Sequence, residues 1–402
     1  MAEGALQGIK VVEYAGLAAG PFCGKLLSDL GAEVIKVEPP QGDEARRRGP
    51  FPQDVPHRER SGLFLYLNTN KLGVSLDVES ATGARLLRDL ILQSDIFIED
   101  LTPGRAEELG FGYEQLRREH GSLVHISITP FGQTGPYRQY KAYPLNSFHA
   151  GGEGYCLPIG SGTKEREPIK GGRYLGEYDA GVAAALAGLS ALFHRLATGA
   201  GQEVDVSKQE ALICLQRVDL GRFPNDGHIP SRWFTGWKQV GGPVECEDGW
   251  IVITAPQNHQ WEGLTEYMGR PDWATGEEAK DEVTRHKNAD EIQPKLAEWM
   301  RTRKRLDVYR GAQANSCPVG IIRDVREVIE NPQEQARGFF QEITHPEAGV
   351  YLYPTAPYQF SETPWALRRP APLLGQHNED ILCGRLGLSK QELVQLARAG
   401  II

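Results

Sequence analysis

The regular alternation of short apolar runs with amphipathic segments over the first 130 residues limits the possible folds more than any other feature of the sequence. Runs of this kind predict buried strands separated by helices. Strands are predicted at 9–14, 32–37, 74–78, 95–99 and 123–128, and helices at 22–30 and 81–93. Strands that alternate with helices form an open parallel sheet, so the sequence predicts an α/β protein.

A change in this pattern predicts the domain organisation. The length of 402 residues exceeds what one hydrophobic core usually organises. Residues 219–243 are rich in Gly, Pro and Trp, which is typical of a connection, and short apolar segments return after Pro332. The predicted divisions are a large domain at 1–215 and 340–402, linkers at 216–229 and 326–339, and a small α+β domain at 230–325.

Composition excludes several classes of function. A net charge of −9 argues against nucleic acid or an anionic membrane as a partner. The six cysteines include no C-x-x-C pair and no histidine at zinc spacing, which predicts no metal site and fits a reducing compartment. No stretch approaches 18 uninterrupted apolar residues, and the N-terminus lacks a secretion signal, so we expect a soluble cytoplasmic protein.

Two loops near the N-terminus carry possible binding residues. The turn at 16–20 is rich in glycine but does not read G-x-G-x-x-G, which argues against a dinucleotide cofactor. The polar loop at 39–60 contains three consecutive arginines, Arg46, Arg47 and Arg48, which we expect to be solvated. Ligands of parallel sheets bind beyond the carboxyl ends of the strands, which points to the loops at 100–104 and 131–136.

Two carboxylates, Glu177 and Asp179, precede the apolar helical run at 182–196. Helix N-termini carry unpaired N–H groups and a partial positive charge, which hold and orient a carboxylate. Asp179 is therefore either a helix cap or, with Glu177, part of a catalytic site. The small residues Gly181 and Gly188 further along the run allow another backbone to approach closely.

The chain resembles the family III CoA-transferases, the group that includes formyl-CoA transferase and carnitine CoA-transferase. The resemblance spans nearly the whole chain and is strongest in the segment that follows the central helix. Its motifs are Ala19-Gly20-Pro21, residues 31–38, Asn70-Lys71, Leu76-Asp77, Pro103-Gly104, residues 132–136, Thr198-Gly199-x-Gly201-Gln202-x-Val204-Asp205-Val206-Ser207, Arg337-Gly338 and residues 371–377.

The resemblance implies both an architecture and a reaction. It implies a Rossmann-like parallel-sheet large domain, a small domain, and a dimer of two chains threaded as interlocked rings. It also implies that CoA passes from an acyl-CoA donor, such as succinyl-CoA, to an organic acid through an enzyme-bound anhydride and thioester. The family's nucleophile is an aspartate four residues before the glycine that enters the helix. That position is Glu177 here, with Asp179 two residues later.

The resemblance and the loop positions together imply a set of CoA-binding residues. CoA itself is the expected cofactor-like substrate, and no metal is expected. The expected contacts are Ala18, Ala19, Leu76, Asp77, Asp100, Leu101, Thr102, Lys141 and Tyr143. The chain departs from its relatives at Pro39 and Glu108, where relatives can carry arginines, and loss of two cations weakens pairing with phosphates.

Several functional alternatives stay open at this point. Because both the nucleophile and the CoA pocket are altered, the chain is either an active transferase or a silent subunit that pairs with an active homologue, as in benzylsuccinate CoA-transferase. A 2-acyl-CoA racemase would need a base such as His149, and an acyl-CoA-binding regulator would need only the pocket. The dimer would therefore pair the chain with itself or with a homologous subunit.

Overall fold

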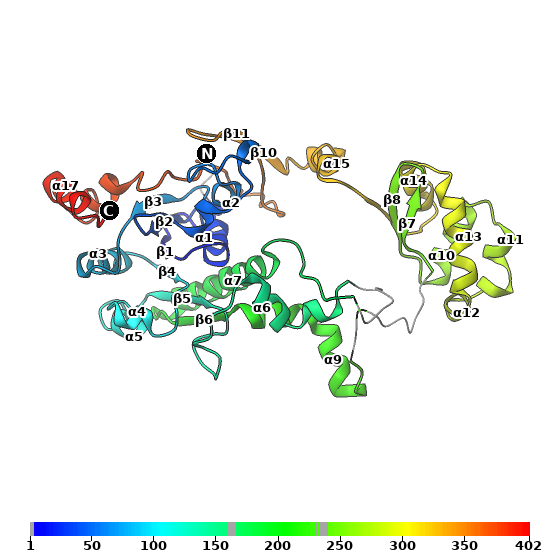
Figure 1. Cartoon of the computed structure of the whole chain (residues 1–402), viewed down its shortest axis with the longest axis horizontal. Coiled ribbons are helices and arrows are strands. Elements are labelled where there is room, and N and C mark those ends of the chain that lie inside the picture. The colour runs from blue at the N-terminus through cyan, green and yellow to red at the C-terminus, as the bar shows by residue number, and fades with distance from the viewer. Residues whose placement is uncertain (1–3, 159–165, 230–231, 233–239) are drawn as a thin grey trace. The chain divides into compact units, whose positions relative to one another are not determined.

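The computed structural model describes residues 4–158, 166–229, 232 and 240–402. The chain divides into two compact units, each treated by itself below (Figure 1). The larger unit comprises residues 1–232 and 339–402, and the smaller comprises 233–338. The predicted start of the small domain falls near residues 230–239, most of which lie outside the described residues, so that boundary stays a prediction.

The larger unit is built on a six-stranded parallel sheet with the order β3-β2-β1-β4-β5-β6. This confirms the predicted α/β architecture. The strands are β1 (Lys10–Tyr14), β2 (Glu33–Glu38), β3 (Leu72–Ser75), β4 (Ile96–Glu99), β5 (Val124–Thr129) and β6 (Glu203–Ser207). The strand order reverses between β1 and β4, and such a reversal leaves a crevice at the carboxyl ends where ligands bind.

Helices cover both faces of this sheet because successive strand residues point to opposite sides. Val11 faces a core shared with α1 and α7, whereas Val12 faces a core shared with α3 and the C-terminal segment. The helices of this unit are α1 (Ala19–Asp29), α2 (Gly62–Leu67), α3 (Ala81–Ile91), α4 (Arg105–Glu108), α5 (Tyr113–Leu116), α6 (Pro144–Ala150), α7 (Leu175–Thr198), α8 (Lys208–Ile213), α9 (Arg217–Asp226) and α17 (Lys390–Arg398).

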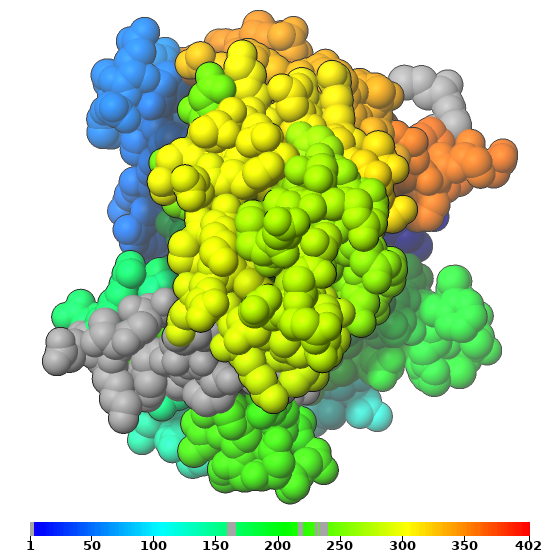
Figure 2. All heavy atoms as spheres, turned by 90° about the vertical axis from the view of Figure 1, so that its right-hand side faces the viewer, coloured from blue at the N-terminus to red at the C-terminus, as the bar shows by residue number. Residues whose placement is uncertain are grey.

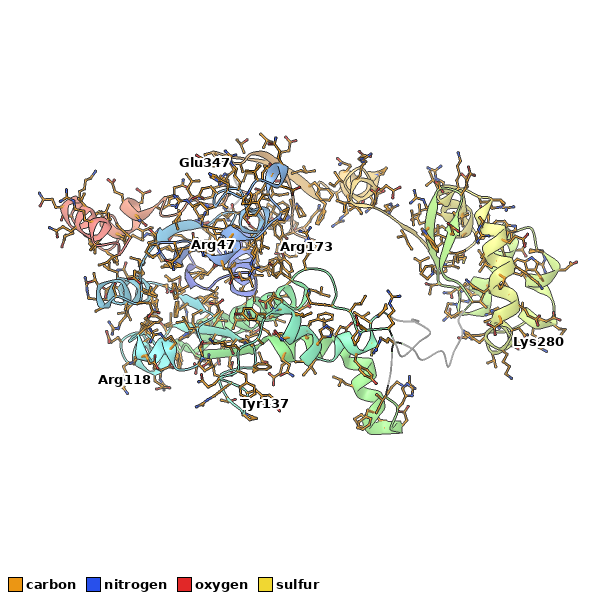
Figure 3. The ribbon with its side chains drawn as sticks, viewed as in Figure 1. Arg47, Arg118, Tyr137, Arg173, Lys280 and Glu347 are labelled. Atoms are coloured by element: carbon orange, nitrogen blue, oxygen red, sulfur yellow. The ribbon has the colours of Figure 1, made fainter. Side chains whose placement is uncertain are left out.

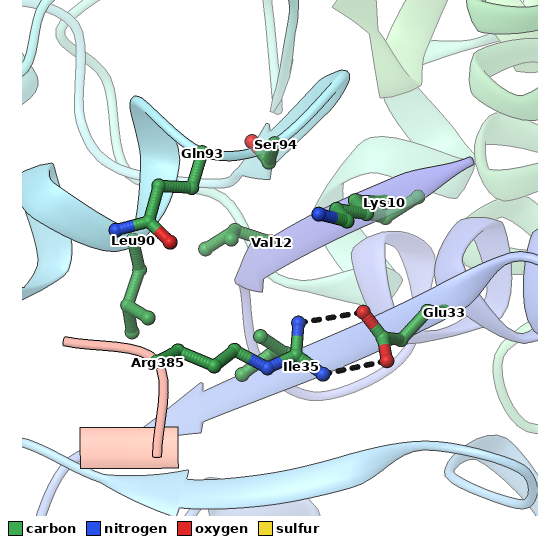
Figure 4. Close-up of a pocket in the computed structure, with 9 residues that line it drawn as sticks. Lys10, Val12, Glu33, Ile35, Leu90, Gln93, Ser94 and Arg385 are labelled. Atoms are coloured by element: carbon green, nitrogen blue, oxygen red, sulfur yellow. Dashed lines mark hydrogen bonds and ion pairs between the residues drawn. The ribbon is translucent and has the colours of Figure 1, made fainter. Parts of the chain in front are cut away.

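The C-terminal segment returns to the sheet. The hairpin β10 (Phe340–His345) and β11 (Gly349–Pro354) leads into it, and the His377 N–H then donates to the Gly73 carbonyl of β3 at 2.9 Å. Arg385 donates from both terminal nitrogens to Glu33 at 2.6 and 2.5 Å (Figure 4). The pocket of about 350 Å³ beside this pair includes Lys10 and Glu33. Both residues begin strands, so the pocket lies at the edge of the sheet opposite the crevice.

The smaller unit has its own core and an antiparallel sheet, β7 (Gly242–Cys246), β8 (Gly249–Ile253) and β9 (Val319–Ile322). Ile251 on β8 packs with Trp261 and Leu296 from the covering helices. These helices are α10 (Asn258–Tyr267), α11 (Asp272–Thr275), α12 (Glu282–Lys287), α13 (Ala289–Arg301) and α14 (Arg305–Ala314), and Figure 2 shows their surface as green-yellow to yellow spheres. The short helices α15 (Val325–Ile329) and α16 (Pro332–Ala336) follow β9 in the chain.

Helices α1 and α7 pack unusually closely, which places the start of α7 against the β1–α1 loop. A Cβ atom at Gly181 would lie 2.7 Å from the carbonyl oxygen of Ala19, so a larger residue would force the helices apart. Helix α1 begins at Ala19, three residues before its predicted start. Pro21 does not prevent this, because proline is tolerated in the first turn, where N–H groups have no partner within the helix.

The described part of the chain contains one helix, α7, long and apolar enough to cross a membrane. Ala180, Ala184 and Leu192 on one side of α7 are buried in the core with the sheet. That packing accounts for part of its apolar character. On another face, Val182, Leu186, Phe193 and Leu196 are 50%, 68%, 75% and 73% exposed.

The prediction that all three consecutive arginines are solvated is wrong for Arg46. Its side chain is 1% exposed and donates to both carboxylate oxygens of Glu38, at 2.6 and 2.8 Å, and to Glu59. Two acidic partners compensate the loss of hydration, which makes burial of a guanidinium tolerable. Arg47 and Arg48 are exposed, and Figure 3 labels Arg47 in the larger unit.

Candidate active site

Glu177 lies in the first turn of α7, and its side chain is buried. Helix α7 begins at Leu175 after Tyr174, which supplies no capping side chain. The Lys208 Nζ donates to Glu177 Oε2 at 2.7 Å, and the two side chains are 13% and 4% exposed. The carboxylate therefore meets two positive features, the helix N-terminus and an ammonium group.

Lys208 reaches this position because it is the first residue of α8, directly after strand β6. Ser207 caps that helix by accepting the Glu210 N–H at 3.2 Å. Asp205, two residues earlier, accepts the Gln133 N–H with both oxygens, at 3.1 and 2.9 Å. The end of β6 thus supplies the partner of Glu177 and also holds the loop at 131–136 that was predicted to face a ligand.

Asp179 does not cap the helix, so that alternative is wrong. It lies in the second turn of α7, since the helix starts at Leu175 rather than after the carboxylates, and the unpaired N–H groups precede it. Its Oδ2 atom is buried and has no hydrogen-bond partner within the described residues. Burial raises the pKa of this carboxyl above its ordinary value.

Asp100 follows β4 and meets the β1–α1 loop. The Gly16 N–H donates to Asp100 Oδ2 at 2.9 Å, and the Leu17 N–H donates to Asp43 Oδ1 at 3.0 Å. Burial raises the pKa of Asp100 to about 7, against the opposing charge of Lys208 and the hydrogen bond from Gly16. Burial, followed by the negative charge of Asp100, raises the pKa of Tyr14 to about 12.

A pocket of about 170 Å³ opens at the carboxyl ends of β1, β2 and β4, where the strand order reverses. Its walls come from the ends of these strands and from the loops that follow them. The lining residues are Tyr14, Ala15, Gly16, Lys36, Val37, Glu38, Pro39, Gly42, Asp43, Glu44, Asp100 and Leu101.

The predicted CoA-binding residues are distributed unevenly around this pocket. Asp100 and Leu101 line it. Ala18, Ala19 and Leu76 are 0%, 1% and 0% exposed as whole residues, so neither their side chains nor their backbone present surface to a ligand. Asp77 is half-buried, and Thr102, Lys141 and Tyr143 are exposed and do not line the pocket. The structure therefore gathers two of these nine side chains in the pocket.

Lys208 was missed by the sequence prediction, although one signal could have found it. It directly follows the run at 203–207, whose alternating apolar residues are typical of a strand, and ligand-facing residues of parallel sheets lie just after a strand. Within the described residues, no group of three or more His, Cys, Asp or Glu side chains is arranged to hold a metal ion. The charged groups that the structure places at this site are the carboxyls of Glu177 and Asp100 and the ammonium of Lys208.

Residues 6–378 match CoA-transferase family III. The chain belongs to this family. The predictions of the family and of the enzyme class are therefore confirmed, and acyl-CoA and an organic acid as substrates are consistent with it.

Curated relatives match over the full length. Formyl-CoA:oxalate CoA-transferase of Streptomyces coelicolor is 31% identical, over 100% of both chains. Succinyl-CoA--D-citramalate CoA-transferase of Chloroflexus aurantiacus is 30% identical, over 99% of this chain and 98% of the relative.

Solved structures show the same fold. A CAIB/BAIF family protein from Brucella suis superposes with a TM-score of 0.83 at 28% identity, covering 95% of this chain and 99% of its own. Rv3272 from Mycobacterium tuberculosis gives a TM-score of 0.81 at 25% identity, with 94% and 99% covered. The large parallel sheet is thus a property that this chain shares with CAIB/BAIF family structures.

Proposed function

We propose that this chain is an active CoA-transferase that moves CoA from an acyl-CoA donor to an organic acid, with Glu177 as the nucleophile. The observation that carries the proposal is the buried Glu177 carboxylate, held at the N-terminus of α7 by Lys208 at 2.7 Å. A nucleophile needs a fixed direction and limited access of water, and burial with one ion pair supplies both.

The reaction follows from what a carboxylate can do to a thioester. A Glu177 oxygen attacks the thioester carbonyl, the C–S bond breaks, and CoA departs as its thiolate. The acyl group is then joined to Glu177 as a mixed anhydride. The thiolate then attacks the Glu177 carbonyl, which forms the enzyme thioester and releases the donor's acid. The carboxylate of the incoming acid attacks the enzyme thioester, which releases CoA thiolate and forms a second mixed anhydride. The thiolate then attacks the incoming acid's carbonyl in this anhydride, which frees Glu177 and forms the new acyl-CoA. Glu177 Oε2 accepts a hydrogen bond from Lys208, so we assign the attack to the other oxygen, Oε1.

Glu177 in place of an aspartate is compatible with this role. One added methylene moves the carboxylate by about 1.5 Å, and an error of about 1 Å in position can cost roughly 100-fold in rate. Lys208 offers a way to fix the longer side chain, because its ammonium is anchored at the start of α8. The donor that the names of the relatives suggest is formyl-CoA or succinyl-CoA, and we propose succinyl-CoA as the first to test.

The experiment that tests the proposal is trapping of the covalent enzyme. The purified chain is incubated with succinyl-CoA and then with hydroxylamine or borohydride, and its peptides are analysed by mass spectrometry. We expect the modification on Glu177 and none in Glu177→Gln. A folded protein that acquires no modification alone, but supports exchange with a homologous subunit, would establish the silent-subunit alternative instead.

We further propose an obligate dimer of interlocked chains, in a cytoplasmic location. The exposed apolar residues Val182, Leu186, Phe193 and Leu196 recur along one face of α7, which is the spacing of a helix that packs against a partner. An interface of a permanent complex buries more than about 2,000 Å². Sedimentation at nanomolar concentration tests this proposal, since a folded species of 44.5 kDa would contradict it.

A further inference from the structure

The pocket at the crevice offers little positive charge to a ligand. The charged groups of its lining are four carboxyl groups and one ammonium, from Glu38, Asp43, Glu44, Asp100 and Lys36. The Lys36 side chain is 0% exposed, and its Nζ lies 3.1 Å from Glu13 Oε1, 2.8 Å from the Ala15 carbonyl oxygen and 2.8 Å from Asp43 Oδ2. A phosphate group needs cationic partners, so the crevice pocket by itself does not suit one.

A second pocket, of about 500 Å³, adjoins the crevice pocket and shares Gly42 and Glu44 with it. Its other lining residues are Gln41, Arg47 and Arg48. The crevice pocket, at about 170 Å³, is smaller than the range of about 300–1,000 Å³ that is usual for small-molecule sites. A molecule as large as CoA therefore extends beyond the crevice, and the shared wall leads it into the adjoining pocket.

The two arginines of the adjoining pocket differ in their partners. Arg48 donates from Nε to Glu44 Oε1 at 3.1 Å, and its Nη2 donates to the same oxygen. Arg47 donates from Nη2 to the Gln41 carbonyl at 3.5 Å, and the described residues give it no ion pair. A guanidinium carries five N–H donors, so most of those of Arg47 are free to bind an anion.

The backbone that carries Arg47 is held in place by the end of β2. Arg47 is the last residue of a short 3₁₀ helix, Glu44–Arg47, which Asp43 caps by accepting the Ala45 N–H at 2.8 Å. The turn before it closes through the Gly42 N–H, which donates to the Pro39 carbonyl at 2.7 Å. The exposed Arg47 side chain (Figure 3) therefore starts from a fixed position on the wall of the pocket.

We propose that Arg47 binds a phosphate group of CoA in the adjoining pocket, while an uncharged part of the molecule enters the crevice. The inference rests on the proposed function, because it takes CoA as the ligand. CoA carries phosphate in its pyrophosphate bridge and at the 3′ position of its ribose, and a guanidinium can donate two parallel N–H groups to either. Arg47 then contributes affinity for the substrate, whereas Glu177 performs the transfer.

Isothermal titration calorimetry of the full-length protein tests this proposal without any covalent step. The ligands are CoA, dephospho-CoA, which lacks the 3′-phosphate, and pantetheine, which lacks every phosphate. We expect Arg47→Gln to raise the Kd for CoA about 10-fold, the scale of one charge-assisted hydrogen bond, and to leave the Kd for pantetheine unchanged. Arg47→Glu adds a repulsive charge and should raise the Kd for CoA about 100-fold.

Arg58→Gln is the matched control. Arg58 is an arginine of the same loop, its side chain is 67% exposed, and it lines neither pocket. This variant should bind CoA as the unmodified chain does. Salt at about 1 M should shrink the difference between Arg47→Gln and the unmodified chain, because it screens an exposed charge pair, whereas an effect on loop structure would persist. Circular dichroism verifies that each variant is folded.

The outcomes separate this inference from the proposed function. A loss of affinity for CoA alone assigns Arg47 to the 3′-phosphate, and a loss for both CoA and dephospho-CoA assigns it to the pyrophosphate, so either supports the proposal. Unchanged CoA binding by folded Arg47→Gln, an equal loss for pantetheine, or a loss that persists in salt overturns it. If the unmodified chain does not bind CoA, both proposals fail. Binding that depends on Arg47 in a chain that forms no adduct on Glu177 overturns only the nucleophile.

Discussion

Two groups of buried charges in the larger unit differ in how completely they are paired, one on β1–β3 and the other on α7 and after β4 and β6. Beneath β1–β3, Lys71 donates to Glu13, to the Pro21 carbonyl and to Asn68, at 2.7, 2.8 and 2.9 Å. The other oxygen of Glu13 accepts from Lys36 at 3.1 Å. Every Lys71 donor and both Glu13 oxygens therefore have partners.

The group around Glu177 is paired only in part. Glu177 has one ion pair through one oxygen, Asp100 has a single backbone donor, and Asp179 Oδ2 has no partner within the described residues. A completely paired network holds the structure, whereas incompletely paired carboxylates beside a crevice keep oxygens available for chemistry. The difference between these groups can be tested by removing one member of each.

The largest expected effect is that of Glu177→Gln on CoA exchange. The amide keeps the size of the side chain but removes the nucleophile, so we expect exchange to fall by at least about 10⁴-fold. A CoA exchange assay with succinyl-CoA and an organic acid measures it. Glu177→Asp, which restores the residue that the resemblance leads one to expect, is the matched variant and should retain activity. Full exchange by folded Glu177→Gln would place the nucleophile elsewhere.

The second effect is on stability. Lys71→Met leaves Glu13 buried with half of its pairing, and breaking a buried pair from one side costs about 3–5 kcal/mol. Denaturant unfolding at fixed protein concentration measures this change in the free energy of unfolding, and Lys390→Met, which removes an exposed lysine paired with Glu379, serves as the exposed control. A loss no larger than that of the control would show that the network beneath β1–β3 does not hold the structure.

Comparison with the sequence shows why the parallel sheet was easier to predict than the burial of Arg46. The parallel sheet was predictable because apolar runs such as 95–99 are local and must be buried. The burial of Arg46 was not, since its partner Glu59 is 13 residues away in a loop without a periodic pattern. Charge runs are usually solvated, and only the folded loop reveals the exception.

Within the site, the carboxylates could be identified but their surroundings could not. Glu177 is recognisable from its position before Gly181, whereas its partner Lys208 lies 31 residues further along the chain. The start of α7 was misplaced because Tyr174 caps no N–H group with its side chain, so the usual signal of a helix start is missing. Contacts between separate elements depend on how they pack, which local patterns do not encode.

A third, smaller effect concerns the pH dependence of stability through Asp100. Its folded pKa of about 7 lies above its ordinary value of 3.8, so the folded state binds more protons than the unfolded state between these values. This contribution to stability is present at low pH and is lost as pH rises through 7. Asp100→Asn carries no titratable group at this position and so does not lose this stability. The difference in free energy of unfolding between the variant and the unmodified chain should therefore shift in favour of the variant by on the order of 1 kcal/mol from pH 4 to pH 8, a value reduced by partial solvent screening. Thermal unfolding across this range measures the difference, and parallel curves for the two proteins would contradict it.

The smallest effect is expected for Asp179→Asn, and it separates the two neighbouring carboxylates. Asp179 has no ion pair among those described, and burial raises the pKa of its carboxyl, so its ionised form slightly destabilises the folded state as pH rises above the ordinary value of 3.8. The amide removes that charge at nearly constant volume, so stability at pH 8 should change by no more than about 0.5 kcal/mol, in the stabilising direction. CoA exchange should fall by less than about 3-fold, a change of under about 1 kcal/mol in activation free energy, because Glu177 and Lys208 are untouched. If Asp179→Asn instead abolishes exchange while Glu177→Gln retains it, Asp179 is the nucleophile, and the ion pair of Glu177 with Lys208 then serves the structure and not the reaction.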